Sequence, residues 1–166
     1  TALRLLDTDY VFFCEHDVAY PPQHFDECPM AGGYLYNTHV WKVDATDGKA
    51  LSYIVEQTSG LSGNRLSLIE HYTRRVAHVR AHGFSRQMGF EPGKPVKHGG
   101  IDDVPRHPWS SSVPLVDIRH GACLTPSRWR KDQFRSQRYT EGWTEGIGVP
   151  GWDMTVGRLD AFLADV

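Results

Sequence analysis

The sequence has few cysteines and no long apolar segment. Its three cysteines, Cys14, Cys28 and Cys123, are widely spaced, and they match neither the framework of a disulfide-rich secreted domain nor the spacing of a zinc finger. A reducing cytoplasm is therefore the expected location. No stretch reaches the roughly 18 consecutive apolar residues of a transmembrane helix, and the opening apolar residues are too few for a signal peptide. We expect a protein without a membrane partner.

The chain also lacks a strong excess of charge of either sign. Its net charge of −2 implies no general attraction to nucleic acids or membranes. The charges are nevertheless unevenly distributed: residues 1–47 carry eight acidic and two basic side chains, whereas residues 119–138 carry six basic side chains and one acid. This distribution would suit a substrate with phosphates, which a metal ion bound by the acidic half and the cations of the basic half would attract. Solvated helix faces are the alternative explanation.

Length and patterning predict one α/β domain that spans residues 1–166. A chain of 166 residues with 40% hydrophobic residues is long enough for a single globular core. Runs of aromatic and β-branched residues predict the strands, which we place at 10–15, 33–43, 49–56 and 113–118. The turn residues at 44–48 join the second and third of these into a hairpin.

The clearest helical pattern covers residues 64–82. Apolar residues recur there at three- and four-residue steps, at Leu66, Ile69, Tyr72, Val76 and Val79. Asn64 or Ser62 would cap this helix, and Gly83 would end it. Residues 59–64 are expected to be a loop, and residues 84–112 a flexible loop that is a candidate lid over a substrate. Shorter helices are expected at 22–28, 126–134 and 154–164.

Two motifs could carry chemistry. Glu15-His16-Asp17 follows an apolar run, and on an extended strand residues two apart point to the same side, so the two carboxylates would lie together. Carboxylates at a strand end are suitable ligands for a divalent cation. Arg119 and His120 end a second strand, where they offer a guanidinium for phosphate and an imidazole for a metal.

The segment from Asp9 to Pro21 resembles the acidic metal motif of GT-A glycosyltransferases, with Glu15 in place of the first aspartate. The order of elements is also similar: acidic triplet, strand pair, helix, strand, then His120. The resemblance implies a Rossmann-related mixed sheet flanked by helices, and a glycosyltransferase of the hexosyltransferase type. It further implies a nucleotide-sugar donor, most often a UDP-sugar, and Mn²⁺ or Mg²⁺ bound by Glu15, Asp17 and His120. In this interpretation the donor is contacted by His16, Arg119 and Trp152, with Trp41 and Trp109 as further candidates for the pocket wall.

The sequence departs from the GT-A pattern in two places. Inverting members carry an acidic pair where the acceptor-side helix starts, and here residues 61–65 contain no acid. The catalytic base is then Asp153, with Asp102, Asp103 and Asp117 as alternatives, or the enzyme retains configuration and needs no base. Only fourteen residues precede Glu15, so we expect much of the N-terminal nucleotide-binding half of such a fold to be missing from this chain.

A narrower resemblance concerns small bacteriophage glycosyltransferases that modify hydroxymethylated bases in DNA. It rests on short segments such as Phe-Cys-Glu-His-Asp-Val-Ala-Tyr-Pro and Asp-Ile-Arg-His-Gly. It implies a hydroxymethylated pyrimidine in DNA as acceptor and the cytoplasm of a bacterial host as location. Two alternatives remain open: a degenerate GT-A domain that binds nucleic acid or a partner, and a metal-dependent phosphoesterase. The sequence does not indicate an oligomeric state.

Overall fold

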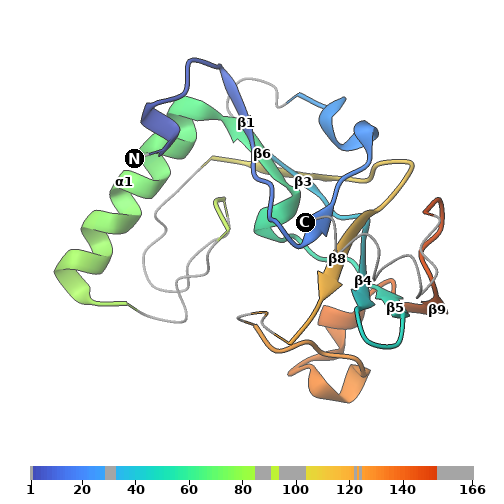
Figure 1. Cartoon of the computed structure of the whole chain (residues 1–166). Coiled ribbons are helices and arrows are strands. Elements are labelled where there is room, and N and C mark those ends of the chain that lie inside the picture. The colour runs from blue at the N-terminus through green and yellow to red at the C-terminus, as the bar shows by residue number, and fades with distance from the viewer. Residues whose placement is uncertain are drawn as a thin grey trace. The chain divides into compact units, whose positions relative to one another are not determined.

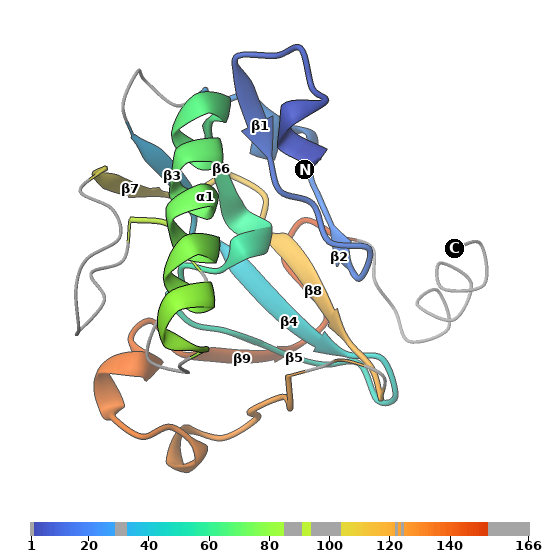
Figure 2. The same ribbon diagram turned by 90° about the vertical axis from the view of Figure 1, so that its left-hand side faces the viewer.

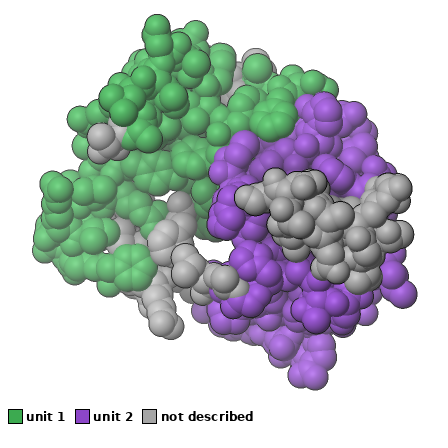
Figure 3. All heavy atoms as spheres, viewed as in Figure 1, with its two compact units in different colours: residues 1–13, 25–36, 56–109 green, residues 14–24, 37–55, 110–166 purple. Residues whose placement is uncertain are grey.

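The computed structural model describes residues 2–28, 33–84, 91–93, 104–121, 123 and 125–152. These residues form a mixed α/β structure with two sheets and one main helix. The chain divides into two compact units, coloured separately in Figure 3, and each is described by itself. The predicted α/β class is confirmed at this level. No helix in the described part of the chain is long and apolar enough to cross a membrane.

Unit 1 comprises residues 1–13, 25–36 and 56–109 and contains a four-stranded sheet. Its strand order is β1 (Tyr10–Phe12), β6 (Leu61–Asn64), β3 (Tyr34–Asn37) and β7 (Arg106–Trp109). β6 pairs antiparallel with both β1 and β3, as Figure 1 shows. Short 3₁₀ turns accompany these strands at η1 (Ala2–Arg4) and η3 (Thr58–Gly60).

The prediction of a loop at 59–64 is wrong, because this segment contains the strand β6. Small residues there predict a turn, but pairing on both sides supplies the backbone hydrogen bonds of a strand. Gly63 is needed at its position because a Cβ there would lie 2.9 Å from Cδ1 of Tyr34. The buried Tyr34, Tyr36, Leu61 and Leu68 form the core of unit 1 around this contact.

The helix α1 (Arg65–His82) confirms the clearest sequence prediction, and Figure 2 shows its full length. The side chain of Asn64 accepts hydrogen bonds from the backbone N–H groups of Leu66 and Ser67, at 3.0 and 3.2 Å. Gly83 ends the helix with a φ of 79°, a left-handed conformation that glycine adopts at low cost.

The predicted apolar stripe of α1 is only partly the buried face. Leu66 and Val76 are 65% and 47% exposed, whereas the buried residues of the helix are Leu68, His71 and Arg75. Leu68 packs in the core of unit 1, and the His71 ring lies 6.3 Å from that of Tyr34. Periodicity indicates which residues share a face of the helix, but contact with the sheet decides which face is buried. The buried face of α1 includes polar side chains.

Unit 2 comprises residues 14–24, 37–55 and 110–166 and contains a five-stranded mixed sheet. Its order is β2 (Val18–Ala19), β8 (Leu115–Arg119), β4 (Val40–Asp44), β5 (Lys49–Ser52) and β9 (Thr144–Ile147). β4 and β8 are parallel, whereas the other neighbours are antiparallel. β4 and β8 are largely buried, as strands covered on both faces are.

Several predicted elements of unit 2 and its boundary need correction. The predicted strand 33–43 is two strands, β3 and β4, which belong to different sheets. The hairpin with the predicted strand 49–56 is confirmed, as β4 and β5, although β5 ends at Ser52. The strand β9 lies in a glycine-rich segment and was not predicted. The predicted strand 113–118 corresponds to β8.

The remaining elements are short. The predicted strand 10–15 ends at Phe12, and the predicted helix 22–28 is the 3₁₀ turn η2 (Pro22–Phe25). The predicted helix 126–134 is reduced to η5 (Lys131–Gln133), followed by η6 (Gln137–Thr140). The Gln133 side chain accepts hydrogen bonds from the backbone N–H groups of Trp129 and Arg130, at 2.7 and 2.9 Å. These local hydrogen bonds compete with those that a longer helix would need. The segment 84–112, expected to be a loop, contains β7 in its described part, and the predicted helix 154–164 lies outside the described residues.

Candidate metal centre

The Glu15-His16-Asp17 motif lies in a tight turn that leads into β2. The backbone N–H of Val18 donates to the carbonyl of Glu15 at 3.3 Å, so His16 and Asp17 occupy the two central positions of a four-residue turn. This turn replaces the extended strand end that the sequence predicted. Side chains at the two central positions of a turn need not point to alternating sides of the chain, as successive side chains of a strand do.

A second turn follows β8 and lies beside the first. The backbone N–H of Cys123 donates to the carbonyl of His120 at 3.2 Å. β2 and β8 are antiparallel, with Val18 opposite Asp117, and the N–H of Ile118 donates to the carbonyl of Asp17 at 2.8 Å. Antiparallel pairing thus places the start of β2 beside the end of β8, which brings the two turns together.

Three potential metal ligands meet where these turns lie. One ligand atom from each of His16, Asp17 and His120 lies within 4.8 Å of the other two. His120 Nε2 is 3.8 Å from Asp17 Oδ2, and the two imidazole rings have centroids 6.5 Å apart. Asp17 and His120 are half-buried and His16 is exposed. Two imidazoles and a carboxylate are a set that binds divalent transition ions.

The structure groups the predicted metal ligands only in part. Asp17 and His120, two of the three ligands that the resemblance implies, come together, whereas the third member of the cluster is His16, which the resemblance placed at the donor. The Glu15 carboxylate does not belong to this group, because the turn removes the alternation on which that pairing was based. Burial raises the pKa of Glu15, and the charges of Asp17 and Asp117 raise it further.

Arg119 is held by the residues around it. Its Nη1 donates to Asp117 at 3.2 Å, its Nε donates to Ser127 at 3.0 Å, and its Nη2 donates to the carbonyl of Thr125. Burial alone would lower the pKa of Arg119, but the Asp117 charge and hydrogen bond outweigh it and the pKa is raised. Asp117 itself is buried and also lies 3.7 Å from Lys42 Nζ, so it is poorly placed to act as the base.

Two of the predicted tryptophans, Trp152 and Trp41, lie elsewhere in unit 2 than the cluster. The Trp152 indole N–H donates to the carbonyl of Pro114 at 2.8 Å, just before β8, whereas His120 follows the other end of that strand. Five strand residues lie between these positions, so they are six steps apart, which corresponds to roughly 20 Å. Trp41 is buried in the core of unit 2. Asp102, Asp103 and Asp153, the other candidate bases, lie outside the described residues.

The basic C-terminal segment forms a surface of cations and aromatic rings in unit 2. The rings of Tyr53 and Trp143 stack at 5.7 Å, and Phe134 meets both edge-on. Arg128 lies over the Phe134 ring at 5.1 Å, and Lys131 over the Trp143 ring at 6.0 Å. Phe134 and Trp143 are half-buried and the two cations are exposed. We call these five residues the aromatic-basic surface.

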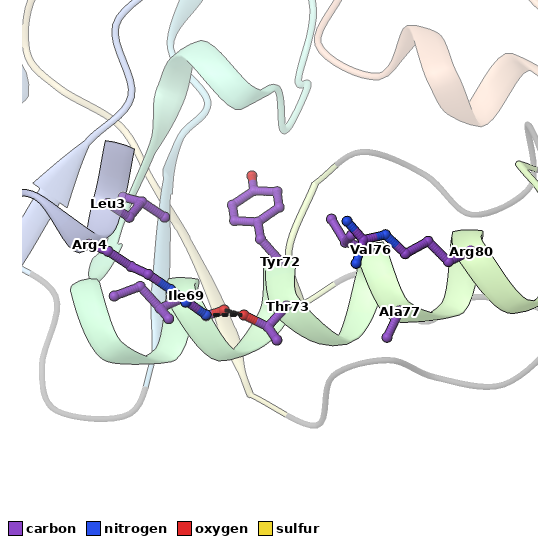
Figure 4. Close-up of a pocket in the computed structure, with 8 residues that line it drawn as sticks. All are labelled: Leu3, Arg4, Ile69, Tyr72, Thr73, Val76, Ala77 and Arg80. Carbon is purple, nitrogen blue, oxygen red and sulfur yellow. Dashed lines mark hydrogen bonds between the residues drawn. The ribbon is translucent and has the colours of Figure 1, made fainter. Parts of the chain in front are cut away.

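A hollow of about 440 Å³ lies in unit 1 (Figure 4). It is bounded by η1 and by one side of α1, and its lining is apolar apart from two arginines, Tyr72 and a threonine. Arg4 donates to the hydroxyl of Thr73 at 3.4 Å, the contact drawn as a dashed line. The hollow shares no residue with the metal cluster. Its lining consists of Leu3, Arg4, Ile69, Tyr72, Thr73, Val76, Ala77 and Arg80.

Comparison with known proteins identifies no relative. No protein-family model matches the sequence, no curated protein matches it, and no solved structure matches the fold.

Proposed function

We propose that this chain is a metal-dependent glycosyltransferase of GT-A type, which moves a sugar from a nucleotide-sugar donor, such as a UDP-sugar, to an acceptor hydroxyl. The observation that carries the proposal is the convergence of Asp17 and His120. They come from positions more than one hundred residues apart, and they are two of the three residues that the resemblance implies as metal ligands. Their 3.8 Å separation supports this pairing.

In this proposal Asp17, His120 and His16 bind the ion, and the resemblance implies Mn²⁺ or Mg²⁺. A bound divalent ion supplies positive charge that stabilises a diphosphate leaving group. The nearby Arg119 guanidinium holds residues 125–127 beside the end of β8 through Ser127 and Thr125. Its direct contact with a donor stays a prediction.

The aromatic-basic surface supports a nucleic acid as acceptor. Exposed guanidinium and ammonium groups beside aromatic rings suit phosphates and unstacked bases. A hydroxymethylated pyrimidine in DNA is the acceptor that the narrower resemblance implies. The same surface favours the second candidate function, a nucleic-acid-binding module without catalysis. A phosphoesterase with two metals is less favoured, because the described residues contain one group of three potential ligands.

The test is isothermal titration calorimetry of Mn²⁺ and UDP-glucose with the wild-type chain and two variants. Asp17→Asn removes the carboxylate charge at nearly constant size, and Asp26→Asn does the same at an exposed position outside the cluster. We expect UDP-glucose binding that requires Mn²⁺, is lost in Asp17→Asn and is retained in Asp26→Asn. Metal-independent binding of DNA, equal in all three proteins and without donor binding, would instead establish the binding module.

A further inference from the structure

Cys123 places a sulfur atom at the metal cluster. Its Sγ lies 3.8 Å from Oδ2 of Asp17, and the thiol donates to that oxygen. This is the same oxygen that lies 3.8 Å from His120 Nε2. A sulfur and a nitrogen from one turn therefore approach one carboxylate oxygen from the other turn. We call His16, Asp17, His120 and Cys123 the four-residue cluster.

The turn that carries His120 and Cys123 has the form of a metal-binding turn. Two residues separate these positions, the spacing found between paired ligands of zinc sites. The backbone N–H of His120 donates to Cys123 Sγ at 3.3 Å, and the turn is closed by the N–H of Cys123 on the His120 carbonyl at 3.2 Å. An N–H that points at sulfur stabilises the negative charge of a thiolate.

The two measured separations are close to those between neighbouring ligands of a tetrahedral ion. With metal–ligand distances of about 2.3 Å to sulfur and 2.0 Å to nitrogen or oxygen, neighbouring ligands of a tetrahedral zinc site lie about 3.5 Å (S to O) and 3.3 Å (N to O) apart. The observed separations are both 3.8 Å. One ligand atom from each of His16, Asp17 and His120 lies within 4.8 Å of the other two, and Cys123 Sγ joins this group through its contact with Asp17 Oδ2. Binding of one ion by all four residues therefore requires the Cys123 side chain to move toward the two imidazoles.

We propose that the four-residue cluster is a binding site for a transition-metal ion of the zinc type, with Cys123 Sγ as a ligand. Thiolate and imidazole ligands select Zn²⁺ and related ions, whereas Mg²⁺ and Mn²⁺ prefer sites built of oxygen. The Cys123 thiol loses its proton to solvent on binding, and the thiolate and the Asp17 carboxylate then balance the two charges of the ion. The inference concerns the same residues as the proposed glycosyl transfer, and it names a zinc-type ion in place of the Mn²⁺ or Mg²⁺ that the resemblance implies. It requires no sugar nucleotide.

The test is a titration of the full chain with Co²⁺, an optically active substitute for Zn²⁺, without any nucleotide. We expect the visible absorption of tetrahedral Co²⁺ together with the near-ultraviolet charge-transfer band of a cobalt–thiolate bond, and displacement of both by Zn²⁺. Cys123→Ser should abolish the charge-transfer band and weaken Co²⁺ binding at least about 10-fold, the lower end of what loss of a supporting residue costs. Cys28→Ser, at an exposed cysteine in unit 1, should leave both signals unchanged.

A second measurement uses the wild-type protein alone and does not depend on how a variant folds. Iodoacetamide labelling, followed residue by residue with mass spectrometry, should become at least about 10-fold slower at Cys123 when Zn²⁺ is added, with Cys14 and Cys28 unaffected. Binding of Co²⁺ without a charge-transfer band, or labelling of Cys123 that ignores Zn²⁺, would overturn the role of the sulfur. Absence of Co²⁺ and Zn²⁺ binding would overturn the site. Neither result decides whether Mn²⁺ supports UDP-glucose binding, so the two proposals fail separately.

Discussion

His24 makes the stability of unit 2 sensitive to mild acid. Its side chain is 1% exposed and lies against the ring of Tyr20, with centroids 5.0 Å apart. Its Nδ1 is 3.3 Å from the amide nitrogen of Asn37, which also donates to Ser111 at 2.9 Å. The Asn37 amide donates, so His24 Nδ1 accepts and carries no proton. Burial lowers the pKa of His24 from 6.5 to about 4, because a charged imidazolium is poorly solvated there.

The direction and size of the effect follow from this difference in pKa. Between about pH 4 and 6.5 the unfolded chain binds a proton at His24 that the folded chain does not, so the free energy of unfolding falls as the pH falls through this range. Above the unfolded pKa both states are neutral and His24 adds no pH dependence. A difference of about 2.5 pKa units corresponds to roughly 3 kcal/mol in full, of which about 2 kcal/mol is lost between about pH 7.5 and pH 5.

The replacement His24→Gln removes the titrating group and keeps an oxygen that can accept from Asn37. Urea unfolding of both proteins at about pH 7.5 and pH 5 should show that the wild type loses about 2 kcal/mol more than the variant. His82→Gln, at an exposed position of α1, measures the effect of replacing a surface histidine. An NMR titration in which the folded His24 ring protonates near pH 6.5 would refute the argument, as would equal pH dependence of wild type and His24→Gln.

Two matched pairs test the core of unit 1. Leu68→Ala creates a cavity at a fully buried position and should lower the free energy of unfolding by about 2–5 kcal/mol. Leu66→Ala, at a residue 65% exposed, should change the free energy of unfolding by less than about 0.5 kcal/mol. Equal losses of the two variants in urea unfolding would show that the apolar stripe predicted from the sequence is the buried face. Gly63→Ala forces a methyl group to within 2.9 Å of Tyr34 and should cost about 1–3 kcal/mol. In the control Gly121→Ala the added methyl group meets no atom within 4 Å, so thermal unfolding should show nearly unchanged stability. Unchanged stability of Gly63→Ala would contradict the close packing of β6 on β3.

The candidate site shows where pattern analysis of the sequence succeeds and where it stops. Asp17 and His120 were identified from residue type and position after apolar runs, and antiparallel pairing of β2 with β8 brings them together. Glu15 was assigned by strand alternation, which does not apply in a turn. Cys123, the further ligand that we propose, was not identified because Asp17 lies far from it in the sequence, although only two residues separate it from His120.

The structures that depend on neighbouring residues follow directly from the amino-acid sequence. The Asn64 cap, the eighteen-residue helix that follows, the hairpin of β4 and β5 and the apolar strand β8 each depend on neighbouring residues. Three other features arise only when distant segments meet: residues 61–64 form a strand, residues 33–43 are divided between two sheets, and two distant turns form one cluster. These outcomes depend on hydrogen bonds and contacts between segments far apart in the chain, and the pattern of one segment carries no record of the partner that will complete it.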